Sequence, residues 1–155
     1  LGVKVGKECR FTGNPRWGSE PWLIQVGNHV LLSAEVNFVT HDAGTFLFRD
    51  TEEYKDVFKF APIVIHDNCF IGMRSTLLPG IEIGPNSVVA AGSIVTRSVP
   101  PGEVWGGVPA HFIETTKEYA DKCKETKLPY DMQAYNTDMK SELLRVTHKT
   151  YEFFK

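Results

Sequence analysis

The chain has 155 residues, of which 42% are hydrophobic and 23% charged, and its formal net charge is −2. This composition is typical of one globular domain that is large enough to bury a core. The slight negative charge argues against a nucleic-acid-binding protein, and no apolar run approaches the roughly eighteen residues of a membrane-spanning helix. The three cysteines are scattered and suggest neither a disulfide framework nor a metal site, so we expect a cytoplasmic protein.

Apolar side chains return every six residues in two short fragments near the start of the chain. They stand at Val5, Phe11, Val26, Leu32 and Phe38. Neither a helix, with its period of 3.6 residues, nor a strand, with its period of two, produces such spacing. The period is lost between the fragments and again after the second one, so we expect the chain to leave the repeat twice.

The two expected excursions are residues 13–22 and 43–62. The first contains two prolines and two tryptophans, and the second contains five aromatic residues around a charged stretch at 49–53. Structureless loops of about twenty residues are uncommon in compact domains and are often functional. A loop this aromatic has to pack on something, and a neighbouring subunit is the natural surface.

The period then runs without interruption over residues 65–100. The aliphatic positions are Ile65, Ile71, Leu77, Ile83, Val89 and Val95, and the small or aliphatic ones are Cys69, Ser75, Ile81, Ser87, Ser93 and Val99. A sustained period of six predicts a parallel β-helix, in which three short strands form a coil of about eighteen residues. Stacked coils would place each aliphatic side chain over its equivalent in the next coil.

The residues between these positions favour the left-handed form of the β-helix. Three residues after each aliphatic position stand Asn68, Arg74, Gly80, Asn86, Gly92 and Ser98. Four of the six are Gly or Asn, which best tolerate a positive φ, so a bend is expected in every hexad. A β-sandwich would instead turn about every 8–12 residues. The predicted fold is all-β, a left-handed parallel β-helix with a long excursion loop.

The remainder of the chain is charged and lacks the period. Residues 115–126 and 137–154 are predicted to be helices, the second amphipathic and capped near Thr137, with a loop over 128–136 between them. Open β-helices need their ends covered. We therefore expect a β-helix domain over residues 1–113 and a short α-helical extension over 114–155 that packs on it.

Several phrases of the sequence resemble a known family. Val-Val-Ala-Ala-Gly-Ser-Ile-Val-Thr at 88–96, Val-Pro-Pro-Gly at 99–102 and Gly-Gly-Val-Pro-Ala at 106–110 resemble the closing signature of hexapeptide-repeat acyltransferases. Asn-Phe-Val-Thr-His-Asp at 37–42, followed by the long insertion, is similar to the maltose and galactoside O-acetyltransferase branch. The resemblance covers roughly residues 26–113, and the hexads alone would specify only the fold.

The resemblance implies an enzyme that moves an acetyl group from acetyl-CoA to a hydroxyl of a sugar or polysaccharide precursor. It further implies a homotrimer whose active sites lie between adjacent subunits, with no metal. His41 would be the general base, since an imidazole is matched to this task near neutral pH. Asn37, Asp42 or a backbone carbonyl would hold its tautomer.

For acetyl-CoA, the resemblance suggests Ala91, Gly92, Thr96, Arg97 and Gly107. The acceptor is expected near residues of the two excursions, namely Glu20, Trp22, Arg49, Asp50 and Tyr54. Aromatic rings and carboxylates are suited to sugar faces and hydroxyls. Relatives usually carry basic residues after the Pro-Ala step, where this chain has His111 and Glu114, so Lys117 is expected to substitute for them.

Two other function classes share the fold. A γ-class carbonic anhydrase would need three zinc-binding histidines, but the five histidines of the chain lack the His-x4-His spacing of that site. A non-catalytic assembly protein would use the column only as a surface, and loss of turnover in His41→Ala would exclude it. His66 stands at an outward position of the repeat, so its substitution is expected to have little effect.

Overall fold

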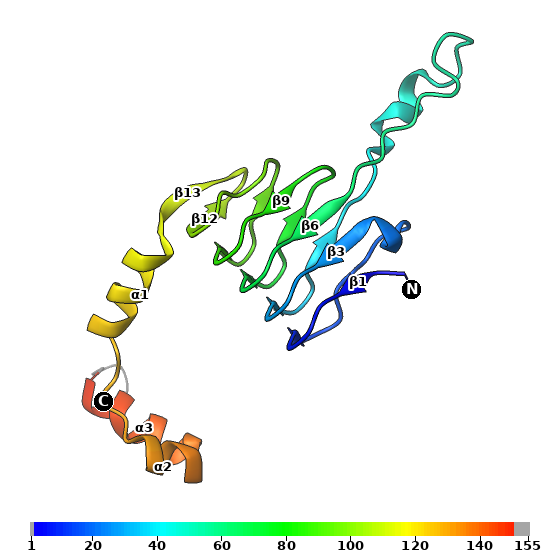
Figure 1. Cartoon of the computed structure of the whole chain (residues 1–155). Helices are drawn as coiled ribbons and strands as arrows, with labels where there is room; N and C mark the ends of the chain where they lie inside the picture. The colour runs from blue at the N-terminus through cyan, green and yellow to red at the C-terminus, as the bar shows by residue number, and fades with distance from the viewer. Residues whose placement is uncertain (1, 151–155) are drawn as a thin grey trace. The chain divides into compact units, whose positions relative to one another are not determined.

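The computed structural model describes residues 2–150 of the chain (Figure 1). Its contacts divide the chain into two compact units, of which the first ends at Tyr119 and the second begins at Ala120. The first unit contains the strands of the described chain. The second unit contains helices, the first of which, α1 (Thr116–Glu125), begins in the first unit. Each unit is described by itself.

Three β-sheets make up the first unit, and the chain visits them in turn. The first sheet contains β1 (Lys4–Val5), β3 (Ile24–Val26), β6 (Ile63–Ile65) and β9 (Glu82–Ile83). The second contains β2 (Arg10–Phe11), β4 (Leu31–Leu32), β7 (Phe70–Ile71), β10 (Val88–Val89), β12 (Glu103–Gly107) and β13 (Ala110–Thr115). The third contains β5 (Asn37–Phe38), β8 (Thr76–Leu77) and β11 (Ile94–Val95).

All neighbouring strands are parallel except β12 and β13, which form a closing antiparallel hairpin. Short parallel strands that recur in the same three sheets form a parallel β-helix, as the period of six predicts. Figure 1 shows β1, β3, β6 and β9 side by side as successive coils.

The core is a stack of equivalent side chains. Ile65 pairs in register with Ile83, Ile71 with Val89, and Leu77 with Val95. All six of these aliphatic residues are buried, which confirms the sequence prediction. Removing each such side chain from water contributes about 1.5–3 kcal/mol, so the column of apolar side chains is the main stabilising element of this unit.

The predicted small interior positions are also buried, and their polar atoms are satisfied. The hydroxyl groups of Ser75 and Ser93 both donate to the carbonyl oxygen of Ala90, at 3.1 and 2.6 Å. Ser87 donates to the carbonyl oxygen of Pro100 at 2.9 Å. A buried hydroxyl is costly unless it is hydrogen-bonded, so these bonds explain why serine is tolerated inside the column.

Five of the six expected bends have the positive φ that the sequence predicts. They are Asn68, Arg74, Gly80, Asn86 and Gly92, with φ between 57° and 82°, whereas Ser98 does not have a positive φ. The same bend recurs at Glu8, His29 and Glu35, three residues after an apolar position of the earlier fragments. The repeat therefore begins before the uninterrupted run.

The first expected excursion is shorter than residues 13–22. Arg16 forms a parallel bridge with Asn37, and the Trp17 ring stacks on Phe38 with 4.9 Å between centroids. Trp17 thus continues the six-residue period from Phe11, and the prediction is wrong for this part of the segment. The chain leaves the column only over residues 18–23, which include the 3₁₀ turn η1 (Pro21–Leu23).

The second excursion leaves the column, as predicted, and projects away from the sheets (Figure 1). It begins with the 3₁₀ helix η2 (Ala43–Phe48) and returns where Phe60 bridges His41 in antiparallel fashion. Several apolar side chains of the loop are exposed, including Phe46 at 71% and Leu47 at 86%. Exposed apolar patches of this kind commonly mark interaction surfaces.

The helical part of the chain differs from the prediction in its middle. Helix α1 (Thr116–Glu125) lies close to the expected range, but α2 (Met132–Thr137) occupies part of the expected loop, and α3 (Met139–Thr150) follows almost directly. The expected end of the last helix, residues 151–154, lies outside the described residues. Asp131 accepts a hydrogen bond from the Ala134 amide and thereby caps α2, a start signal that the loop prediction missed.

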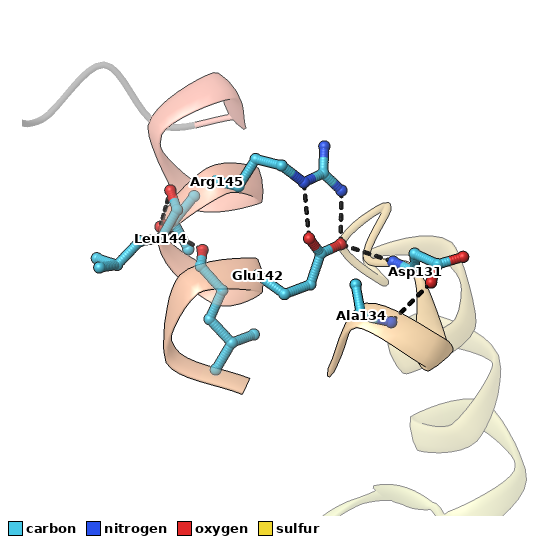
Figure 2. A network of polar contacts seen from close by, with 7 residues as sticks. Asp131, Ala134, Glu142, Leu144 and Arg145 are labelled. Atoms are coloured by element: carbon cyan, nitrogen blue, oxygen red, sulfur yellow. Dashed lines mark hydrogen bonds and ion pairs between the residues drawn. The ribbon is translucent and has the colours of Figure 1, made fainter. Parts of the chain in front are cut away.

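A polar network joins α2 and α3 (Figure 2). The buried Glu142 carboxylate accepts a hydrogen bond from the Asp131 amide at 2.7 Å and from Arg145 Nε at 2.7 Å and Nη2 at 2.5 Å. A buried carboxylate is tolerated when it is paired and hydrogen-bonded in this way. That the extension packs on the β-helix stays a prediction.

Candidate active site

His41 stands where the chain leaves the column. It follows β5 by three residues, and its backbone bridges Phe60 on the returning segment of the excursion. Its ring lies 5.9 Å from the Phe60 ring, centroid to centroid. The side chain is 36% exposed, so one part of the imidazole is held by the protein and another part is accessible.

Glu20 holds His41 in place. Its Oε2 atom lies 2.9 Å from His41 Nδ1 and accepts a hydrogen bond from the Thr40 hydroxyl at 2.6 Å. The hydrogen bond from Thr40, followed by that from His41, lowers the pKa of Glu20 below its usual value. Because an ionised carboxylate only accepts, Nδ1 carries a proton, and in the neutral tautomer of the imidazole the lone pair is therefore on Nε2. A carboxylate that holds one ring nitrogen leaves the other nitrogen available to accept a proton.

The side chains that the sequence suggested for this task are engaged elsewhere. Asn37 donates to the carbonyl oxygen of Glu35 at 3.3 Å. Asp42 caps η2 by accepting from the Gly44 amide at 2.9 Å, and its other oxygen lies 3.3 Å from Lys59 Nζ. The Gly44 amide, together with Lys59, lowers the pKa of Asp42. Within the described part of the chain, neither side chain forms a hydrogen bond with the His41 ring.

The sequence predicted Glu20 at the acceptor and placed Asn37, Asp42 or a backbone carbonyl beside His41. The two residues are twenty-one positions apart, and the local sequence gives no period that would bring them together. One signal was available, because Glu20 is the only acidic residue in the segment 13–22. A lone carboxylate in a short turn needs a polar partner.

A cleft of about 210 Å³ lies beside His41. It is lined mainly by polar residues and by aromatic residues of the excursion, among them Glu20, His41, Asp42, Arg49, Phe58 and Lys59. The structure therefore brings Glu20 and Arg49, both expected at the acceptor, to the same cleft as His41. It does not bring Trp22, Asp50 or Tyr54 to this cleft; Tyr54 packs on Phe48 instead, with 5.5 Å between ring centroids.

Four of the residues suggested for the donor flank β11 of the third sheet, with Ala91 and Gly92 before it and Thr96 and Arg97 after it. Residues 96–97 come directly after β11, and residues 39–40 come directly after β5, so the two pairs occupy equivalent positions of different coils. In the third sheet, one strand, β8, lies between β5 and β11. With strands about 4.8 Å apart, Thr96 and Arg97 lie about 10 Å along the column from the start of the segment that carries His41. Arg97 lies over the Trp105 ring, 5.6 Å from its centroid.

The expected glycines have conformations that explain their identity. Gly92 has φ +71°, and a Cβ atom there would meet nothing within 4 Å, so the backbone faces open space. Ala91 precedes it in the same turn. Gly107 ends β12 with φ +99°, and its amide lies 3.3 Å from the Ser93 hydroxyl. Lys117 is exposed in the first turn of α1.

Residues 2–150 contain no group of three or more His, Cys, Asp or Glu side chains arranged to hold a metal ion. In the same part of the chain, none of the helices has the length and apolar character needed to cross a membrane. A second His–Glu pair exists outside the cleft, where His66 Nε2 lies 2.9 Å from Glu82 Oε2 on the surface of the column.

Comparison with known sequences identifies the repeat. The family described as the hexapeptide repeat of succinyl-transferase matches residues 62–97. Protein CapG of Staphylococcus aureus is 47% identical over 127 residues, which are 81% of this chain and 73% of CapG. Galactoside O-acetyltransferase of Escherichia coli is 34% identical over 61% of this chain and 45% of that protein.

A solved structure gives the same result. A hexapeptide-repeat acetyltransferase from Vibrio cholerae superimposes with a TM-score of 0.61 at 30% identity, over 74% of this chain and 62% of that one. The same protein has been solved in complex with acetyl-CoA, and that structure superimposes with a TM-score of 0.59. The chain belongs to the hexapeptide-repeat acyltransferase family.

Proposed function

We propose that the protein transfers an acetyl group from acetyl-CoA to a hydroxyl of a sugar or polysaccharide precursor, with His41 as the general base. The observation that carries this proposal is the contact of 2.9 Å between Glu20 Oε2 and His41 Nδ1 at the edge of a cleft. The relatives support the reaction type, since they include a galactoside O-acetyltransferase and an acetyltransferase solved with acetyl-CoA.

In this reaction His41 Nε2 removes the proton from the acceptor hydroxyl as its oxygen attacks the thioester carbonyl carbon. The tetrahedral intermediate then collapses, the bond from carbon to sulfur breaks, and the imidazolium returns the proton to the thiolate of CoA. Glu20 stabilises the imidazolium and keeps Nε2 directed at the acceptor. General base catalysis of this kind contributes about 10²–10⁴-fold.

The donor is proposed to lie along the corner of the column that follows the third sheet. Thr96 and Arg97 occupy this corner about two strand spacings, or about 10 Å, from the segment that carries His41. Gly92 lies at the preceding corner, before β11, and the open space over it would let the pantetheine arm approach the backbone there. Arg97, and Lys117 in place of the missing basic residues after Ala110, would then pair with phosphate groups.

The active unit is proposed to be a homotrimer of left-handed β-helices. The excursion loop supports this, because it exposes Phe46, Leu47 and Phe58 next to a cleft that it lines itself. Another subunit would cover these side chains and close the cleft from the opposite side. The positive φ at successive bends supports the left-handed form of the helix.

The experiment that tests the function combines donor binding with transfer. Acetyl-CoA should raise the melting temperature in a saturable way, and at about 100 times its Kd the added stability is about 2.7 kcal/mol per site. In a transfer assay that follows free thiol, His41→Ala should lose at least about 100-fold in kcat and still bind acetyl-CoA. His66→Ala is the matched control, because it removes a histidine that also pairs with a glutamate but lies outside the cleft.

A folded protein that acetyl-CoA does not stabilise would contradict the proposal. It would favour a non-catalytic assembly protein that uses the column as a surface. Equal losses of transfer in both histidine variants would contradict the assignment of the base.

A further inference from the structure

We propose that the acceptor carries an anionic group, a carboxylate or a phosphate, that Arg49 binds inside the His41 cleft. This inference rests on the proposed function, because it concerns the acceptor side of the same cleft. The inference follows from the missing hydrogen-bond partners of the Arg49 side chain. Arg49 Nε is buried, and within residues 2–150 the guanidinium forms neither a hydrogen bond nor an ion pair.

Arg49 is held in position without using its donors. It ends η2, and its Cζ lies 4.5 Å from the centroid of the Phe58 ring on the returning segment of the loop. A cation over an aromatic face interacts with the ring electrons and leaves the N–H groups available. The guanidinium has five such donors in a planar fork, which matches two oxygens of a carboxylate or phosphate.

The acidic side chains of the cleft are already paired with other groups. Glu20 accepts from Thr40 and contacts His41. Asp42 accepts from the Gly44 amide and pairs with Lys59. Arg49 is therefore the charged group of the cleft whose partner has to come from outside the described chain.

Carboxylates on the loop do not supply that partner either. Glu52 pairs with Lys55 at 2.7 Å, and Asp50, the next residue in the chain, is exposed and outside the cleft. A buried donor without a partner costs free energy, so its retention in the folded state is explained by a ligand that uses it. An anion on the acceptor would satisfy Arg49 while a hydroxyl of the same molecule faces His41.

The size of the cleft fits a small acceptor. At about 210 Å³ it is smaller than the roughly 300–1,000 Å³ of sites for drug-sized ligands. A single acidic sugar unit is of suitable size, with its ring between the imidazole and the guanidinium. The aromatic Phe58 would then serve both as the support of Arg49 and as an apolar wall for the sugar.

The test compares matched acceptors that differ in one charged group. The pairs are galacturonate with galactose, which tests a carboxylate, and glucose 6-phosphate with glucose, which tests a phosphate. We expect at least one acid to be acetylated with a kcat/KM about tenfold or more above its neutral partner. Arg49→Gln should lower kcat/KM for that acid by about 10- to 100-fold more than it lowers kcat/KM for the neutral sugar.

Two further variants sharpen the result. Arg49→Lys keeps the charge but loses the planar fork, so its kcat/KM for the acid should lie between those of the wild type and Arg49→Gln. Lys55→Gln is the control, because it removes a positive charge from the same loop at a residue that does not line the cleft. This control should keep the wild-type preference.

Calorimetric titration with the same four compounds in the absence of acetyl-CoA separates this inference from the proposed function. Binding of an acid that Arg49→Gln abolishes supports the anion site even if no acetyl transfer occurs. Transfer to neutral sugars without Arg49-dependent binding of either acid supports the enzyme and overturns the anion site. Failure of both acids to bind overturns it as well.

An interface role for Arg49 gives a different result. If its partner is a carboxylate of a neighbouring subunit, Arg49→Gln should reduce the molar mass measured by light scattering. It should then lower transfer to acid and neutral acceptors equally. That outcome would overturn the anion site.

Discussion

Glu20 Oε2 contacts His41 Nδ1 at 2.9 Å, and this contact joins the two places where the chain leaves the column. Glu20 lies in the turn that follows Trp17, and His41 lies at the start of the long loop. The regular coils thus serve as a support that holds two irregular segments next to each other. Functional side chains on such irregular segments can be replaced without disturbing the stack of aliphatic side chains.

The pair can be tested by a double-mutant cycle. Glu20→Gln should reduce kcat by about 10- to 100-fold, because the imidazolium formed in the reaction loses its anionic partner. The same substitution in a His41→Ala background should have no further effect, since Glu20 acts through His41. The measurement is steady-state acetyl transfer at saturating acetyl-CoA. Additive losses in the double variant would show that Glu20 acts on the substrate directly.

Acid should remove a part of the stability that Glu20 provides. The hydrogen bonds from Thr40 and His41 lower its folded-state pKa below the ordinary value of 4.5. A depressed carboxylate pKa stabilises the fold above the ordinary value, and this contribution is lost as the pH falls through the folded-state pKa. In urea denaturation, Glu20→Gln should be less stable than the wild type at about pH 7, and the difference should shrink toward about pH 3. A difference that stays constant over this range would contradict the linkage.

Glu52→Gln is the control for this experiment. Glu52 pairs with Lys55 on the exposed part of the loop, where a surface ion pair contributes little. The free energy of unfolding of Glu52→Gln should equal that of the wild type at each pH.

The column was predictable from the sequence because every coil requires the same type of side chain at the same position. Ile65 and Ile83 are equivalent in successive coils and pair in register, so the requirement for an aliphatic side chain is repeated along the chain. Asn86 and Gly92 occur where the backbone has a positive φ, which few residue types tolerate. Each of these residue preferences is weak at a single position, but its repetition every six residues makes the β-helix recognisable in the sequence.

Where the structure does not repeat, the sequence was less informative. Trp17 was assigned to an excursion because the six-residue period is lost between Phe11 and Val26, yet it occupies the next position of the period after Phe11 and stacks on Phe38. The contact between Glu20 and His41 depends on how the turn at 18–23 folds back, which no spacing rule describes. The prediction of His41 came from family resemblance, and the three-dimensional arrangement identified Glu20 as its partner.

The registered core predicts a large effect of a single truncation. Leu77 is fully buried and pairs in register with both Phe38 and Val95. Leu77→Ala should reduce the free energy of unfolding by about 2–5 kcal/mol, because the rigid coils on each side limit collapse of the cavity. Its neighbour Thr76 points away from the core, and Thr76→Ala should cost less than about 1 kcal/mol. Urea denaturation followed by circular dichroism compares the two, and equal costs would contradict the stacked core.

The exposed apolar side chains of the excursion predict the behaviour of the assembly. Leu47 is 86% exposed and Phe46 71%, which is unfavourable for a loop that stays in water. If a neighbouring subunit covers them, Leu47→Asp places an unpaired charge in that interface and should shift the protein from trimer to monomer. Light scattering measures this shift directly. Thr51→Asp adds the same charge to an exposed residue of the same loop and should leave the mass unchanged. A Leu47→Asp protein that remains trimeric would place the subunit interface elsewhere on the column.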